Sequence, residues 1–291
     1  MPKGFSQMRI RVMTEQDIPA GLRLNTLSGW NQTSADWERF LAMSPQGCFV
    51  MEDGMKVVGT AATICYENRF AWIGMVLVDP DYRKQGIGTQ LLNKTIEHLD
   101  HSNISTIKLD ATPLGKPLYA KLGFVSEFEI DRWILKRPPG TISTIPSSPP
   151  APLTEYQEKE IFTLDRDFFG ADRSFLLRSL CNEAPELAIT VWQDGMPLCF
   201  AYGRHGLFAD HLGPCMATSR VAAEQLLREF LARSSRETLI VDCIKSHPGV
   251  VETLAAFGFV LSRPLTRMVR GPNVYPGRPD SLWAILGPEF G

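Results

Sequence analysis

A glycine-rich segment in the first half of the sequence has the residue types that most clearly suggest chemistry. It reads Arg83-Lys-Gln-Gly-Ile-Gly-Thr89 and follows an apolar run that ends at Val78. Its glycines let the backbone approach a ligand closely, and the first amides of a helix lack acceptors within that helix. An arginine and a lysine beside such amides suit an anion. The spacing predicts a phosphate site at a helix N-terminus; the simpler interpretation is a loop whose glycines only permit a turn.

Two other phosphate motifs do not fit this segment. No Gly-Lys-Ser or Gly-Lys-Thr follows, as a P-loop requires, and Leu91 stands where the third glycine of a dinucleotide-binding fingerprint would be. The helix and hairpin signals before the segment also differ from the start of a Rossmann unit. We therefore expect a phosphate-bearing ligand of another kind.

The surrounding sequence alternates strand and helix signals. Residues 70–78 are almost all apolar, which is typical of a strand buried on both faces, and Asp53-Gly54 between two strand-like runs predicts a hairpin. Antiparallel strands followed by a strand–helix–strand crossover predict a mixed α/β (α+β) fold, a mostly antiparallel sheet flanked by helices. The expected strands are 8–13, 47–52, 56–66, 70–78, 104–110 and 127–136, and the expected helices are 15–29, 34–43, 86–98 and 113–122.

A proline-rich stretch interrupts this pattern. Residues 138–152 contain six prolines and no charged residue, so the stretch cannot join a helix or a sheet interior. We interpret it as an extended linker between one domain at 1–137 and another at 153–291.

The second domain repeats the order of the first. In both, a helix is followed by Gly-Phe, and 32 residues separate Leu91 from Gly123 and Leu226 from Gly258. This equal spacing indicates a duplicated fold. The expected strands here are 187–193, 197–206, 208–216 and 238–244, and the expected helices are 219–233 and 248–257.

Composition bounds the class of protein. The 291 residues are 44% hydrophobic and 21% charged with a net charge of −2, which argues against a disordered chain and gives no sign of a nucleic-acid partner. No apolar run approaches the ~20 residues that span a bilayer, and the first residues lack a signal-peptide core. The six cysteines are scattered without a Cys-x-x-Cys pair. We expect a cytoplasmic protein with reduced thiols, no membrane partner and no metal.

Two motifs of the first domain carry a family resemblance. Arg83-Lys-Gln-Gly-Ile-Gly88 resembles the [RQ]xxGx[GA] pyrophosphate loop of the GNAT (GCN5-related N-acetyltransferase) superfamily, and Pro117-Leu-Tyr-Ala-Lys-Leu-Gly-Phe124 is similar to its LYxxxGF segment. The expected strand order over 8–137 also matches. The resemblance implies an acetyl-CoA-binding catalytic domain.

The same resemblance implies a set of roles. Backbone amides over 85–89 would bind the pyrophosphate of acetyl-CoA, the end of the 70–78 strand would pair with the pantetheine, and an amide near Leu77 would stabilise the oxyanion. Tyr119 would protonate the leaving thiolate; the simpler interpretation is a half-buried aromatic. The cofactor-binding residues so implied are Val76, Leu77, Val78, Arg83, Lys84, Gln85, Gly86, Ile87, Gly88 and Thr89.

The general base stays open, because residues 70–78 contain no carboxylate. Asp79, Glu67, Asp110 and a chain of water molecules are candidates, and Asp79 can instead cap the turn. The amine can also arrive already deprotonated. Four aromatic residues are candidates either for an acceptor pocket or for the core: Trp30, Trp37, Tyr66 and Trp72.

The second domain has lost these signals. Seventeen residues separate Gly74 from Leu91, but only thirteen separate Gly213 from Leu226, and the segment between them lacks the loop glycines. Leu254 stands at the position of the first domain's tyrosine. This half resembles the divergent GNAT-like domain of YitH/HolE-type bacterial acetyltransferases, which implies that it closes the acceptor cleft.

Three further groups in this half favour ordinary structural roles. Asp242, Cys243 and His247 follow no catalytic spacing, and His205, His211 and Asp210 flank one turn without further metal ligands. For Arg267 and Arg270, contact with an anionic acceptor and solvation are both possible, and solvation is favoured.

Together these patterns predict a GNAT-type N-acetyltransferase. It would move acetyl from acetyl-CoA to a primary amine of a small molecule or peptide by direct attack in a ternary complex. The alternatives are a non-catalytic acyl-CoA-binding regulatory protein and an acyltransferase that uses another acyl-CoA. These patterns predict neither the identity of the amine nor the oligomeric state.

Overall fold

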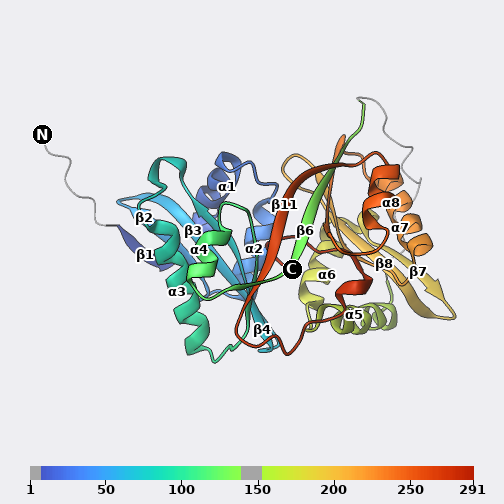
Figure 1. Ribbon diagram of the computed structural model, residues 1–291, viewed down its shortest axis with the longest axis horizontal. Coiled ribbons are helices and arrows are strands. Elements are labelled where there is room, and N and C mark those ends of the chain that lie inside the picture. The colour runs from blue at the N-terminus through green and yellow to red at the C-terminus, as the bar shows by residue number, and fades with distance from the viewer. Residues whose placement is uncertain (1–7, 139–152) are drawn as a thin grey trace, which may run out of the picture. The chain divides into compact units, whose positions relative to one another are not determined.

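The computed structural model describes residues 8–138 and 153–291. The expected linker at 138–152 therefore lies outside the described residues, apart from Pro138. The chain forms two compact units, residues 1–108 and 109–291, and the boundary falls inside strand β5 (Ile107–Ala111) (Figure 1).

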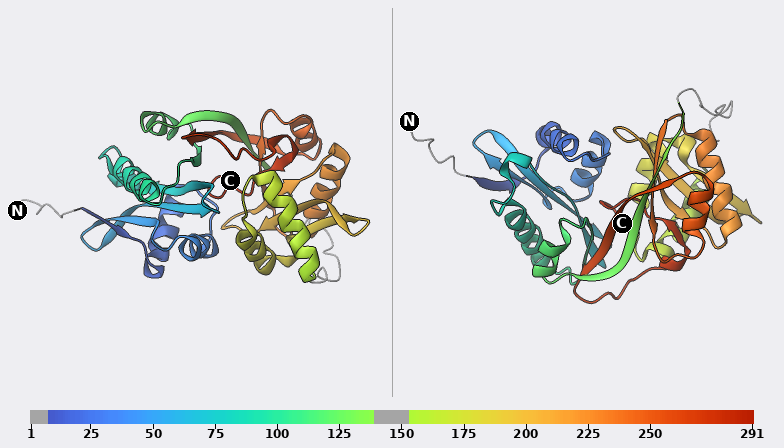
Figure 2. Two further views of the ribbon diagram at one scale, coloured as in Figure 1. Left: turned by 90° about the horizontal axis from the view of Figure 1, so that it is seen from below. Right: turned by 45° about the horizontal axis from the view of Figure 1, so that its top comes forward.

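The first unit is a sheet with helices on both faces. Its helices α1 and α2 lie on one face and α3 lies on the other (Figure 2). Neighbouring strands are antiparallel except for the last pair, in which Ala71 and Trp72 pair in parallel with Ile107 and Lys108. The strand order is β1 (Arg9–Val12), β2 (Cys48–Asp53), β3 (Lys56–Tyr66), β4 (Phe70–Val78) and β5, and the helices are α1 (Ile18–Leu27), α2 (Ser34–Met43) and α3 (Ile87–His101), with 3-10 turns at Glu15–Asp17 and Pro80–Tyr82.

Helix α3 packs closely on the sheet because the strand beneath it carries a glycine. A Cβ atom at Gly59 of β3 would lie 2.9 Å from Leu91 Cδ1 and 3.0 Å from Ile87 Cγ2. Ile87 and Leu91 are 1% and 0% exposed, and both belong to the core that α3 shares with β2 and β3. This packing fixes the first turn of α3 close to the end of β4, where the phosphate site is expected.

The second unit is also a mostly antiparallel sheet flanked by helices, so the expected fold class is confirmed. Strands β9 and β10 are its parallel pair, and β12 pairs with β9. The order is β11 (Val260–Arg270), β6 (Val125–Lys136), β10 (Thr238–Ile244), β9 (Asp210–Met216), β8 (Met196–Arg204) and β7 (Ile189–Gln193), with β12 at Leu282–Ala284. The helices are α4 (Lys116–Lys121), α5 (Glu155–Phe169), α6 (Ser174–Glu183), α7 (Arg220–Arg233) and α8 (Val250–Ala256), with 3-10 turns at Pro185–Leu187 and Pro279–Ser281.

Strand β6 belongs to the first half of the sequence but pairs with strands of the second. Its neighbours are β10, where Ile134 faces Ile240, and β11, where Ile130 faces Leu265. Figures 1 and 2 show β6 and β11 side by side. Because β6 lies among strands of the second half, the compact units do not end at residues 137 and 153. We call this placement of β6 beside β11 and β10 the exchange. The division of the sequence into domains at residues 137 and 153 stays a prediction.

The two strands are related by the sequence repeat itself. Ile130 of β6 faces Leu265 of β11 in the sheet, and these two residues lie 135 positions apart in the sequence. Gly123 and Gly258 are separated by the same 135 positions. Arg132 on β6 and Arg267 on β11 share the same offset. Each forms a two-pronged ion pair with a buried aspartate at the end of a parallel strand: Arg132 with Asp242 at 2.7 Å, and Arg267 with Asp110 at 2.9 Å. The equivalent contacts support a duplicated fold.

Candidate functional site

The N-terminus of α3 presents backbone donors without a side-chain cap. Gly86 precedes the helix with a φ of +81°, in the left-handed region that favours glycine. The first intrahelical bond runs from the amide of Gln90 to the carbonyl of Gly86 at 3.0 Å. The amides of Ile87, Gly88 and Thr89 therefore have no acceptor inside the helix. Such a group of amides at the positive end of a helix dipole can bind a phosphate.

Residues 83–86, directly before this helix, add positive charge and contain no acidic residue. Arg83, Lys84 and Gln85 are exposed, and the first turn of α3 contains no acidic residue. Arg83 Nε donates to the carbonyl of Val78 at 3.2 Å, which ties the loop to the end of β4. The arginine and lysine are accessible to an anion at the helix end.

Asp79 anchors the turn between β4 and this loop. Its carboxylate accepts from Arg23 at 2.8 Å, from Lys56 at 2.9 Å and from the amide of Asp81 at 3.2 Å. Burial by itself would raise the pKa of Asp79, but these three donors outweigh it and lower the pKa to about 2. The geometry therefore matches the capping role and not that of a general base.

Strand β4 has an irregular, partly unpaired edge. Its register against β3 shifts between the pairs Thr60–Leu77 and Ala62–Gly74, and Met75 in the bulge has a φ of +54°. The hydroxyl of Thr60 donates to the carbonyl of Met75 at 2.8 Å, which holds the bulge.

On its other side, β4 pairs with β5 only at its start. The pairing covers Ala71 and Trp72, so the remaining backbone as far as Val78 has no neighbouring strand on that side within the first unit. An unpaired strand edge can bind an extended ligand by backbone hydrogen bonds. The expected cofactor residues at 76–78 and 83–89 therefore lie on one unit, at the end of β4 and the start of α3.

Tyr119 lies on α4 of the second unit. Its ring is half-buried and contacts Phe124 edge to face, with centroids 6.1 Å apart. Burial raises the pKa of Tyr119 to about 12, so its phenol stays protonated at neutral pH. Among the described residues its hydroxyl has no hydrogen-bond partner. The side chain has a proton that it can donate to a ligand.

The other candidate bases are already paired. Glu67 lies in the β3–β4 turn and forms an ion pair with Arg69 at 3.4 Å. This turn is at the start of β4, and at ~3.3 Å per residue the strand separates it from Val78 by roughly 26 Å. The side chain of Asp110 is buried, and both of its oxygens accept from Arg267. Burial raises the pKa of Asp110, and the arginine opposes that rise.

The favoured interpretation of Arg267 as a solvated side chain was wrong. The residue is only 6% exposed, and its guanidinium lies 5.0 Å from the centre of the Phe128 ring while it binds Asp110. Burial of an arginine requires such a partner, and the partner comes from a strand far away in sequence. Arg270 is partly exposed.

Three of the four aromatic candidates are core residues. Trp37, Tyr66 and Trp72 are 0% exposed, so their side chains fill the interior of the first unit, whereas Trp30 is half-buried. The simpler of the two interpretations therefore holds for those three.

The nucleophile-like and metal-like groups of the second unit have structural partners. His205 is held between Asp210 at 2.8 Å and Glu186 at 3.0 Å, and His211 lies 3.1 Å from Asp242. Burial raises the pKa of the Cys243 thiol to about 12, which disfavours a thiolate. No cluster of three or more residues able to ligate a metal occurs in the part of the chain that the structure describes.

In the second unit, the counterpart of α3 is a capped helix. The hydroxyl of Ser219 caps α7, the counterpart of α3, by accepting from the amide of Ala222 at 3.3 Å. Leu254, at the position of Tyr119, is 4% exposed and packs in the core. The features of the first unit's site therefore have no equivalent here.

Comparison with known proteins agrees with this fold. A model of the GNAT acetyltransferase family matches residues 21–124, and a model of a GNAT acetyltransferase domain matches residues 161–284. The chain belongs to the GNAT acetyltransferase family and carries two GNAT domains.

Several known proteins match this chain over most of their length. The uncharacterized N-acetyltransferase YitH of Bacillus subtilis is 27% identical over 253 residues, which cover 84% of this chain and 85% of YitH. Holothin acyltransferase of a Pseudoalteromonas species is 23% identical over 269 residues, 90% of this chain and 87% of that enzyme. The crystal structure of a candidate acetyltransferase from Pyrococcus horikoshii has the same fold, with a TM-score of 0.80, 23% identity and coverage of 99% and 98%.

The helices that the structure describes are not of the kind that spans a membrane. Within 8–138 and 153–291, none is long and apolar enough to cross a bilayer.

Proposed function

We propose that this protein transfers acetyl from acetyl-CoA to a primary amine. The observation that carries the proposal is the uncapped, positively charged N-terminus of α3 beside the unpaired edge of β4. A phosphate-binding helix end and a free strand edge together suit a ligand with a pyrophosphate and an extended amide chain, as coenzyme A has. The membership of the GNAT acetyltransferase family points to the same cosubstrate.

Each step uses groups of this chain. The amides over 86–89, with Arg83 and Lys84, bind the pyrophosphate, and the backbone of 76–78 binds the pantetheine. An amide near Leu77 donates to the acetyl carbonyl and stabilises the negative charge that develops there. Acetyl-CoA supplies the activated acyl group when bound. The amine attacks the carbonyl carbon, the carbon–sulfur bond breaks, and Tyr119 donates its proton to the leaving sulfur.

The proton of the amine leaves without a dedicated carboxylate. Asp79, Glu67 and Asp110 all have cationic partners, so the amine arrives in its neutral form or loses a proton to water before it attacks. As the amide forms, a further proton leaves the nitrogen through water, and the phenol of Tyr119 regains its proton from water. The acceptor is the amine of a small molecule or peptide. The names of two relatives, an N-acetyltransferase and an acyltransferase, support acyl transfer.

One alternative deserves a test because all three candidate carboxylates are engaged. A protein that binds acyl-CoA without turnover would keep the α3 site and lack an activated acceptor. Release of free thiol from acetyl-CoA, measured with amino acids, polyamines, aminoglycosides and peptides, separates the two. Acceptor-dependent release is expected; clear CoA binding without release for any amine would favour the binding protein.

The substitution Gly86→Asp tests the site itself. Aspartate tolerates a positive φ better than most residues, so the helix should still form, but its charge occupies the anion site. We expect the affinity for CoA to fall by at least ~100-fold in calorimetric titrations.

Gly249→Asp is the matched control. Gly249 precedes α8 with a φ of +79°, so the control places the same charge and backbone conformation at a helix that lacks the site. Its affinity for CoA should equal that of the unaltered protein. Unchanged affinity in Gly86→Asp would refute the assignment.

A further inference from the structure

In the second unit, the parallel strands β9 and β10 separate after a short pairing. They pair only where Asp210, His211 and Leu212 face residues 239–241. Beyond these pairs, the segment that contains β12 lies between the two strands. It pairs antiparallel with β9 through Leu282–Met216 and Ala284–Cys215, and on the other side the amide of Ile285 donates to the carbonyl of Asp242 on β10 at 2.9 Å.

The same edge is unpaired in the first unit. Strands β9 and β10 correspond to β4 and β5 in chain order, since each pair encloses one long helix and pairs in parallel only near its start. Gly213 of β9 corresponds to Gly74 of β4. The edge of β9 that β12 covers is therefore the counterpart of the β4 edge proposed to bind pantetheine.

The segment lies tightly against its strands. A Cβ atom at Gly213 would lie 1.9 Å from the carbonyl oxygen of Ile285, so only a glycine allows this approach. Trp283 Nε1 donates to the carbonyl of Ala217 at 3.1 Å, and the amide of Ala217 donates to the carbonyl of Ser281 at 3.2 Å. The three residues of β12 are 1–8% exposed.

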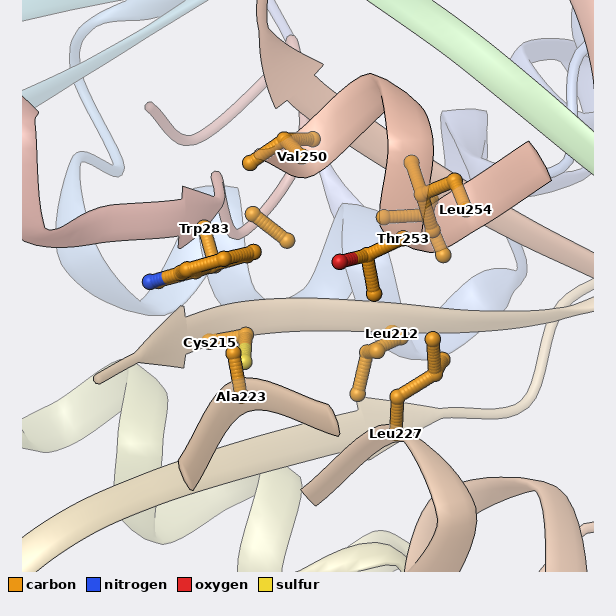
Figure 3. Close-up of a pocket in the computed structure, with 10 residues that line it drawn as sticks. Leu212, Cys215, Ala223, Leu227, Val250, Thr253, Leu254 and Trp283 are labelled. Carbon is orange, nitrogen blue, oxygen red and sulfur yellow. The ribbon is translucent and has the colours of Figure 1, made fainter. Parts of the chain in front are cut away.

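The space left beside the segment is too small for a ligand. A cavity of about 20 Å³ lies between Trp283 and helices α7 and α8, lined by side chains that include Leu212, Cys215, Thr253 and Leu254 (Figure 3). A volume of that size holds about one water molecule. A pantetheine chain could enter only if β12 left.

We infer that the segment 281–285 is a resident occupant of the acyl-CoA groove of the second domain. A peptide strand takes the backbone hydrogen bonds there that a pantetheine would take, and Trp283 fills the apolar space beneath it. The chain consequently binds one acyl-CoA, in the first domain only. The number of one acyl-CoA per chain rests on the proposed function. The occupancy of the groove in the second domain by the segment 281–285 does not.

The first experiment counts sites. Calorimetric titration of the full chain with CoA should give one site per chain, and Gly86→Asp should give none at concentrations that saturate the unaltered protein. Gly249→Asp should keep one. Two sites in the unaltered protein, or one site that survives in Gly86→Asp, would overturn the inference.

The second experiment needs no cosubstrate. Hydrogen exchange of the amides at 282–286 should be slow in the free protein, with protection comparable to that of β9, because they lie between two strands. Addition of excess acetyl-CoA should leave it unchanged. Rapid exchange, or loss of protection on addition, would show that the segment is not a resident occupant. A protein that binds no CoA but shows slow exchange would refute the proposed function and leave the occupant in place.

Discussion

Burial favours the neutral form of both Asp79 and Tyr119, but the net shifts of their pKa values are opposite. Asp79 is almost fully buried, yet Arg23 and Lys56 stabilise its charged form and hold its pKa at about 2. Tyr119 has no such partner among the described residues, and burial raises its pKa to about 12 and keeps it neutral. The first residue is suited to anchor a loop, and the second to donate a proton.

Replacing the phenol of Tyr119 tests its proposed role as an acid. Tyr119→Phe should lower kcat by ~10²-fold or more with little change in CoA affinity, because the lost proton acts only when the thiolate leaves. Steady-state kinetics and calorimetry measure the two effects. Tyr156→Phe, which removes an exposed phenol, should behave like the unaltered protein. Equal turnover in both variants would remove Tyr119 from the mechanism.

Because of the ion pairs of Asp79, the free energy of unfolding should depend on pH in the acidic range. A carboxylate whose pKa is lowered by folding stabilises the protein above its unfolded pKa of 3.8, and that contribution disappears as the pH falls towards about 2. Asp79→Asn should lower the free energy of unfolding by ~1–2 kcal/mol at pH 7 and by much less at pH 2.5.

Denaturant titrations at the two pH values measure this difference. Glu97→Gln, which breaks an exposed pair with Lys94, should cost ~0–1 kcal/mol at pH 7. An equal loss for Asp79→Asn at both pH values would contradict the role of its charge.

At the scale of elements, local patterns predicted much of the fold. Strand β4 and strand β10 match the expected ranges 70–78 and 238–244. Helices α5 and α6 were missed, although Thr154 and Gln157 form a capping box that the sequence displays. The three-residue strand β12 was also missed, because so short a strand has no periodicity of its own and forms only between two others.

Helix α8 borders the small cavity with a hydroxyl that has no partner. Thr253 Oγ1 is buried without a hydrogen-bond partner among the described residues. Thr253→Val keeps the shape and removes the cost of burying that group, so it should raise the free energy of unfolding by ~1 kcal/mol.

A buried threonine on α3 supplies the control. Thr95 Oγ1 donates to the carbonyl of Leu92 at 2.8 Å, so Thr95→Val should instead destabilise the protein by ~1 kcal/mol. Thermal and denaturant unfolding measure both changes. A loss of stability in Thr253→Val would indicate that a water molecule satisfies the hydroxyl.

The exchange of β6 and β11 is a property of the whole molecule. Both neighbours of β6 follow residue 137 in the sequence, and Arg132 on this strand needs Asp242 as its buried partner. An arginine that loses a buried partner destabilises a fold by ~3–5 kcal/mol. The first sequence repeat therefore depends on the second for its last strand.

This dependence can be tested by dividing the chain. In a fragment of residues 1–137, strand β6 should not be protected from hydrogen exchange, because it would lack both neighbours. Coexpression with residues 153–291 should restore the protection of β6, as in the intact chain. Hydrogen exchange at 125–136 is the measurement. A fragment with a protected β6 would contradict the exchange.

The sequence by itself determined the local features of this protein. Glycine spacing predicted the start of α3 and a continuous apolar run predicted β4, because both depend on the preferences of residues that are neighbours in the sequence. The 32-residue spacing indicated a repeat. The tertiary structure alone decided the partners of β6, the pairing of Arg267 with Asp110 and the place of β12 between β9 and β10. Such contacts join residues far apart in sequence, and they depend on which strand edges and buried charges are left unpaired once the local elements have formed.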